Sequence, residues 1–235
     1  MFFNLKSLTC FVCFLTYTEV IAQTKKQKVE EIFQAKNYQL TIDEINLMNS
    51  SEIHFDSILY IKAYSQIKLN QLREANITIN QILQINPNYY ETYFLKGLLF
   101  AKKEKYPDAI SSFNKVLDVN PNHEKALYNM ALAKGLLEDY KSAIKDLDKC
   151  IAINPKYSMA FYNRGYWYEL SEKFDSAIAD YKKTIELDSH YTEAYIALVY
   201  IYSVKGDKIS ACEIINLAKK EGIEIATDLI QEFCK

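Results

Sequence analysis

The chain has 235 residues, of which 49% are apolar and 14% aromatic, and its 28 basic residues nearly balance 30 acidic ones. This apolar content and the net charge of −2 exclude a disordered chain, and the lack of a basic excess argues against nucleic acid as a partner. Because the chain holds only 5 Gly and 4 Pro, it has little material for hairpin turns, so we expect helices rather than β-structure.

Residues 1–22 have the pattern of a secretory signal peptide. Lys6 precedes an uncharged run from Ser7 to Thr18, and Glu19 ends it. As a helix this run would span roughly 18 Å, which is too short for a hydrocarbon core of about 30 Å but suits a signal peptide. We therefore predict no stable membrane span, cleavage after Ala22, and export to a periplasm or the cell envelope. The alternative is an uncleaved cytoplasmic protein.

Residues 23–55 are expected to form a helical hairpin that is a degenerate copy of the units that follow. Only Val29, Ile32, Ile45 and Met48 keep the apolar spacing of those units.

Residues 56–221 are built on a repeat of 34 residues, which predicts five helical hairpins. Pro87, Pro121 and Pro155 lie 34 residues apart, and Ser189 takes the next position of the same frame. Proline ends the second helix of a unit because it lacks an N–H and clashes with the preceding turn. Two apolar-periodic stretches separate consecutive turns, so each unit is expected to be an antiparallel helix pair that completes its neighbour's core.

The side chains at fixed positions of the repeat explain how the two helices would pack. We count each unit from the third residue after its proline. Position 20 is alanine in every unit: Ala75, Ala109, Ala143, Ala177 and Ala211. Position 24 is large in every unit: Ile79, Phe113, Leu147, Tyr181 and Ile215. A small residue lets the two backbones approach closely, and the large one fills the layer toward the next unit.

Two segments of this repeat resemble a known family. YFLKGLLF (Tyr93–Phe100) and FYNRGYWY (Phe161–Tyr168) each follow an asparagine-proline turn and carry an aromatic residue, a glycine four residues later, and a second aromatic residue. The sequence thereby resembles the tetratricopeptide repeat family over Asp56–Glu221. The resemblance implies an all-α, right-handed superhelical solenoid of antiparallel helix pairs, with about five repeats, the N-terminal hairpin, and a C-terminal capping helix over residues 222–235.

The same resemblance implies a non-catalytic scaffold for protein–protein interaction, because the motif encodes packing and not a reaction. We expect no enzyme activity, no metal and no cofactor. Of the three histidines, His123 and His190 fall in loops nearly two repeats apart, too far to share a metal ion. No glycine-rich phosphate loop or hydrolase motif is present. An enzyme of unrecognised type is the weakest alternative.

Several conspicuous side chains are expected to be structural. Arg164 is predicted to lie between Asp146 and Asp180 as a paired charge. Cys150 occupies a position that is normally small and buried, so it is expected to pack as a hydrophobic residue. Trp167 falls outside the positions that the family turns inward.

The last two cysteines form a candidate disulfide. Cys212 precedes Gly222 by ten residues and Cys234 follows it by twelve, so an antiparallel pair of helices would bring them to a similar height. A bridge would pin the terminal cap in an oxidising compartment. The alternative leaves two unpaired thiols.

The resemblance also implies that positions 2, 5, 9 and 12 of each first helix face a concave groove. Positions 5 and 9 carry Tyr60, Tyr64, Phe94, Leu98, Tyr128, Leu132, Tyr162, Tyr166, Ile196 and Tyr200, and position 6 adds Asn129 and Asn163. Tyrosine suits a peptide-binding surface, and an amide can both donate to and accept from a peptide backbone. We therefore expect a protein or peptide partner in this groove.

Two alternatives to the groove remain open. Part of the aromatic stripe could simply pack between adjacent units. The chain could also be a structural or assembly subunit of a cell-envelope complex, with contacts or self-association through its convex face or its ends.

Overall fold

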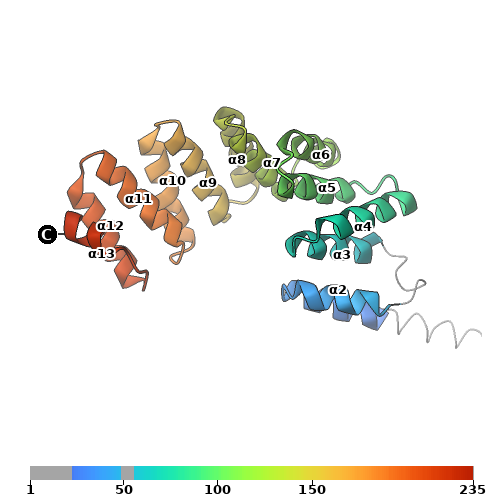
Figure 1. The fold of residues 1–235 in the computed structure, drawn as a ribbon. Coiled ribbons are helices and arrows are strands. Elements are labelled where there is room, and N and C mark those ends of the chain that lie inside the picture. The colour runs from blue at the N-terminus through green and yellow to red at the C-terminus, as the bar shows by residue number, and fades with distance from the viewer. Residues whose placement is uncertain (1–22, 49–55, 235) are drawn as a thin grey trace, which may run out of the picture. The chain divides into compact units, whose positions relative to one another are not determined.

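The computed structural model describes residues 23–48 and 56–234 of the chain (Figure 1). The predicted signal peptide, residues 1–22, lies outside the described residues, as do residues 49–55 of the predicted first hairpin and Lys235. Within the described ranges every regular element is a helix. None of these helices has the length and apolar character that a membrane span requires. The chain forms two compact units, whose boundary along the sequence falls between Lys105 and Tyr106; we call them unit 1 and unit 2.

Unit 1 begins with the degenerate hairpin. Its elements are a helix over residues 23–34, α2 (Tyr38–Asn46), α3 (Asp56–Lys68), α4 (Leu72–Ile85) and α5 (Glu91–Lys102). Helix α3 packs against α2, α4 and α5. Val29, Ile45 and Met48 are buried in one cluster with Ile58 and Ile61 of α3. The few apolar residues that keep the spacing of the repeat therefore join the first hairpin to the rest of the unit.

Unit 2 is an uninterrupted series of helices. It contains α6 (Tyr106–Val119), α7 (Glu124–Leu136), α8 (Tyr140–Ile153), α9 (Ser158–Leu170), α10 (Phe174–Leu187), α11 (Thr192–Val204), α12 (Lys208–Lys220) and α13 (Thr227–Phe233). Each of these helices packs against the next one along the chain (Figure 1). The all-α fold of helix pairs predicted from the 34-residue frame is confirmed.

Small residues set the distance between paired helices. All five position-20 alanines and all five position-24 residues have no exposed surface. At Gly165 of α9, an added Cβ would lie 2.9 Å from Cε1 of Tyr181 and 3.2 Å from Cβ of Asp180, both on α10. Such distances are too short for an ordinary contact, so the close approach of α9 and α10 depends on this glycine.

The turn inside each hairpin has a periodicity that the residue types hide. A residue with positive φ recurs every 34 residues: Lys36, Asn70, Glu104, Glu138, Glu172 and Gly206. The residue after it closes the helix; after Glu138, for example, Asp139 donates its backbone N–H to the carbonyl oxygen of Lys134 at 3.0 Å. This left-handed helix end usually uses glycine, yet only one of the six residues is glycine.

The turns between hairpins are held by a side chain rather than by proline alone. The side-chain oxygens of Asn86, Asn120, Asn154 and Asp188 each accept the backbone N–H of the second residue after them, at 3.1–3.2 Å. Asn and Asp favour turns through this bond. The fourth turn therefore keeps its geometry although Ser189 stands where the others have proline.

The C-terminal cap is shorter than expected. Gly222 adopts φ +76°, and Ile223 donates its N–H to the carbonyl oxygen of Ala218 at 2.9 Å, which ends α12. Residues 223–226 are not helical. They bury Ile223, so the cap helix α13 begins only at Thr227.

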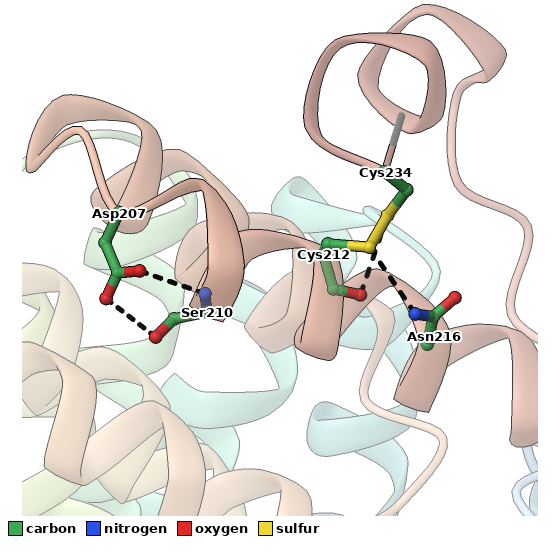
Figure 2. The surroundings of a disulfide bond; sticks show 5 residues. All are labelled: Asp207, Ser210, Cys212, Asn216 and Cys234. Carbon is green, nitrogen blue, oxygen red and sulfur yellow. Dashed lines mark hydrogen bonds between the residues drawn. A yellow bond between two sulfur atoms is a disulfide. The ribbon is translucent and has the colours of Figure 1, made fainter.

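A disulfide fastens this cap to the last repeat (Figure 2). The structure joins Cys212 of α12 to Cys234, which directly follows α13, with an S–S distance of 2.14 Å and a Cα–Cα distance of 5.1 Å. Asp207 caps the start of α12, since its carboxylate accepts the backbone N–H of Ser210 at 3.0 Å and its hydroxyl at 2.7 Å.

Candidate functional site

Aromatic residues at position 5 pack between adjacent repeats. The ring centroids of Tyr128 and Tyr157 lie 5.0 Å apart, and those of Tyr162 and Tyr191 lie 4.9 Å apart. Tyr157 and Tyr191 directly precede the first helix of the following hairpin. These contacts join one hairpin to the next, so position 5 serves mainly to stack the repeats.

Burial at this layer perturbs the tyrosine hydroxyls. Tyr128 is buried, and this burial raises the pKa of its hydroxyl. The pKa of Tyr191 is raised to about 12, first by burial and then by the neighbouring Tyr162 and Glu193. The tyrosines of this layer therefore stay protonated at neutral pH.

The two position-6 asparagines are already engaged within the protein. Asn129 donates its Nδ2 to the carbonyl oxygen of Lys125 at 2.7 Å. Asn163 donates its Nδ2 to the carbonyl oxygen of Met159 at 2.7 Å and to the hydroxyl of Tyr128 at 3.0 Å. Asn163 thus uses both amide protons internally and has only its oxygen left for a partner.

The candidate residues of unit 1 are largely packed. Tyr64 lies in an aromatic cluster with Phe33 and Tyr38, at centroid distances of 5.5 Å and 6.3 Å, and this cluster ties α3 to the first hairpin. Tyr60 packs on Tyr89 at 6.3 Å. Phe94 is buried, and Leu98 is half-buried against the unit 1 core.

Unit 2 presents the exposed part of the stripe beside a cavity. Tyr166 of α9 is 38% exposed, and Ile196 and Tyr200 of α11 are 49% and 55% exposed. A cavity of about 260 Å³ opens here, and we call it the tyrosine pocket. Its lining consists of Tyr162, Tyr166, Glu169, Tyr181, Glu193, Ile196, Ala197 and Tyr200.

The pocket gathers some predicted residues and adds others. It brings together Tyr162, Tyr166 and Tyr200, whereas Leu132 lies half-buried on α7, outside it. Glu193 and Glu169 were missed as site residues, although they occupy positions 2 and 12, which the family resemblance turns to the same side as positions 5 and 9. The repeat frame could therefore have found them.

Two carboxylates give the pocket a negative charge. The buried Tyr181 of α10 donates its hydroxyl to Oε2 of Glu169 at 2.6 Å. Burial and this bond raise the pKa of Tyr181. The pKa of Tyr162 is raised by burial and then by the charges of Glu193 and Glu169. Both carboxylates therefore act on the same tyrosine, and no basic side chain is among the lining residues.

Arg164 is a paired structural charge, as expected, but one predicted partner is wrong. Its Nε and Nη2 donate to the two carboxylate oxygens of Asp180 at 2.8 Å and 2.7 Å, and its Nη1 donates to Asp148 at 2.7 Å. Asp146 instead binds Lys134 of α7. A position-23 carboxylate faces the first helix of its own hairpin, so Asp146 cannot reach across to Arg164 while Asp148 can.

Three other conspicuous residues have structural roles. Cys150 is buried, and burial raises the pKa of its thiol to about 12. Trp167 is buried, stacks on Tyr140 at 5.6 Å, and occupies the space in which a side chain at Gly135 would lie.

His123 is not simply a solvated loop residue. Its Nδ1 accepts the backbone N–H of Ala126 at 3.0 Å and caps α7. His54 lies outside the described residues. Within the described part of the chain, no three His, Cys, Asp or Glu side chains are grouped so as to hold a metal ion.

Comparisons with known proteins place the repeats in one family. The model of the tetratricopeptide repeat matches residues 90–123, 124–157 and 160–191. A DnaJ homolog subfamily C member 7 homolog of Dictyostelium discoideum is 30% identical over 92 residues, which is 37% of this chain. The chain spans only 17% of that relative's length.

Solved structures share the fold. A crystal structure of MamA is 26% identical with a TM-score of 0.62, and the match covers 73% of this chain and 96% of MamA. PilW, described as a widely conserved type IV pilus biogenesis factor, is 17% identical with a TM-score of 0.76, over 92% of this chain and 99% of its own. YrrB, described as a protein with an unusual peptide-binding site, is 20% identical with a TM-score of 0.57, over 70% and 85% of the two chains. At these identities, PilW and YrrB show the fold alone.

The pairing of Arg164 predicts unequal costs for its two carboxylate partners. Arg164→Met should lower the free energy of unfolding by about 3 kcal/mol, because it leaves the buried Asp180 carboxylate without a cation. Asp148→Asn should cost less than about 1 kcal/mol, because Asp148 is half-exposed to water. Urea unfolding of both variants measures the difference, and equal costs would contradict this assignment.

Proposed function

Because this chain is a tetratricopeptide repeat protein, we propose that it is a non-catalytic scaffold that binds a protein or peptide partner on α9 and α11 of unit 2. The observation that carries the proposal is the exposure of Tyr166, Ile196 and Tyr200 beside the tyrosine pocket; we call these three residues the tyrosine face. The other large apolar side chains of α9 and α11 are mostly packed against neighbouring helices.

The chemistry of this face suits a protein partner. Tyrosine combines a large apolar ring with a hydroxyl, and it is enriched among the residues that dominate binding energy. Its side chain also loses little conformational entropy when it is held in place. Packing between repeats fixes the neighbouring Tyr162, so a partner would meet a face that is largely formed before it binds.

A second candidate function is an assembly subunit whose contacts lie elsewhere. Helix α12 leaves Ile209 76% exposed and Leu217 39% exposed. These side chains lie on the second helix of the last hairpin, away from the residues that line the tyrosine pocket. Self-association or complex formation through this surface would not require the tyrosine face.

Paired substitutions separate the two functions. The partner is first identified by crosslinking and purification from the native compartment, and its dissociation constant is then measured with purified proteins. Replacing Tyr166 and Tyr200 by alanine should weaken binding at least about tenfold, since two anchor residues are lost. Replacing Ile209 and Leu217 by alanine should leave the dissociation constant unchanged.

Circular dichroism provides the control for folding, because all four side chains are partly exposed and should not be needed for the fold. Undiminished binding by the folded tyrosine variant would refute the proposed face. Loss of binding in the α12 variant alone would establish the assembly function instead.

We also propose that the chain is exported to an oxidising compartment, a periplasm or the cell envelope. The uncharged run from Ser7 to Thr18 supports this, as does the Cys212–Cys234 pairing, which persists in such compartments. Protein recovered from its host should begin at Gln23 and show a single thiol, that of Cys150, after denaturation. A chain that begins at Met1 and carries reduced Cys212 and Cys234 would contradict export.

A further inference from the structure

The carboxylates of the tyrosine pocket differ from the other buried or paired acids of unit 2. Asp180 binds Arg164, Asp146 binds Lys134, and Asp175 of α10 binds Lys205. Glu169, by contrast, is bound only by the neutral hydroxyl of Tyr181. Glu193 makes no hydrogen bond or ion pair with its side chain among the residues that the structure describes. The pocket therefore holds two negative charges that no cation of the described chain neutralises.

The aromatic part of the pocket favours the same kind of ligand. Tyr162, Tyr166 and Tyr200 line it together, and the faces of aromatic rings attract cations. Carboxylates form short, charge-assisted hydrogen bonds with guanidinium and ammonium groups. An apolar or acidic side chain would instead desolvate or repel Glu193 and Glu169, which is unfavourable. Rings and charges thus favour a cation over a neutral or acidic group.

We propose that the tyrosine pocket takes a basic side chain, arginine or lysine, from the segment that the scaffold binds. This inference rests on the proposed function and adds the chemical class of the residue that is recognised. Glu193, at the mouth of the pocket in the first turn of α11, provides the main charge, because its carboxylate is exposed and uncommitted. Glu169 provides the second charge from α9, where the hydroxyl of Tyr181 holds it in place.

A pair of small probes tests the inference without knowledge of the partner. Nα-acetyl-arginine amide carries the cation, and Nα-acetyl-citrulline amide has nearly the same shape without the charge. Each is titrated into the isotope-labelled full chain, and the amide resonances of α9 and α11 are followed by NMR. At low salt the arginine probe should bind about fivefold more tightly than the citrulline probe, as expected from cation–π and ion-pair contributions.

A matched pair of variants assigns the effect to the pocket. Glu193→Gln should abolish the preference for arginine. Glu124→Gln should leave it intact, because Glu124 lies in the first turn of α7, as Glu193 does in α11, but outside the pocket. Both variants remove one charge and one favourable interaction with a helix N-terminus, so their difference reports the pocket alone.

The outcomes separate this inference from the proposed function. Equal affinities for the two probes, or an unchanged preference in Glu193→Gln, would overturn the basic-side-chain inference. If, in addition, alanine at Tyr166 and Tyr200 still weakens partner binding, the scaffold function stands and only the charge preference fails. If the arginine preference is present and is lost only in Glu193→Gln, the inference holds.

Discussion

The two helices of each hairpin approach closely because alanine occupies position 20 and a small residue commonly occupies position 8. The alanines have no exposed surface, and at Gly165 even one added carbon would be too close to Tyr181. This constraint fixes the helix spacing, and the spacing in turn fixes which side chains fill the layer between hairpins. The large position-24 residues are fully buried as a result. Overpacking at such a contact typically costs 1–3 kcal/mol, roughly the scale at which packing is felt.

The same spacing divides the aromatic residues into two groups. Those at position 5, such as Tyr128 and Tyr162, stack on a tyrosine at the start of the next hairpin. Those at position 9 in the last two hairpins, Tyr166 and Tyr200, keep a large exposed area. The first group makes the array rigid, and the second group is available for a partner. The tyrosine pocket lies where the two groups meet, since Tyr162 belongs to its lining.

Much of the fold follows from the sequence because its signal is covalent and periodic. The spacing of the prolines and alanines predicts the hairpins, and Ser189 keeps its place in the frame because Asp188 makes the turn bond. The positive-φ residues share a position but no residue type, so the sequence does not reveal them. The short cap helix was also missed, because burial of Ile223 competes with helix formation there.

Side-chain partners were harder to predict than helices. The exchange of Asp146 for Asp148 beside Arg164 depends on which way a helix face points, and a repeat frame gives this only to within a few residues. The acidic residues of the pocket were recoverable, since their positions were known to face the same way. The reach of the Tyr181 hydroxyl from the core to Glu169 was not, because it depends on the packed rotamer.

The division of the tyrosines is the central claim, and chemical footprinting tests it most directly. The chain would be nitrated on tyrosine, alone and bound to its partner, and the modified residues identified by mass spectrometry. Tyr166 and Tyr200 should react first in the free chain and become protected in the complex, while the buried Tyr181 and Tyr195 stay unreactive in both. Equal reactivity of Tyr166 and Tyr200 with and without the partner would contradict the account.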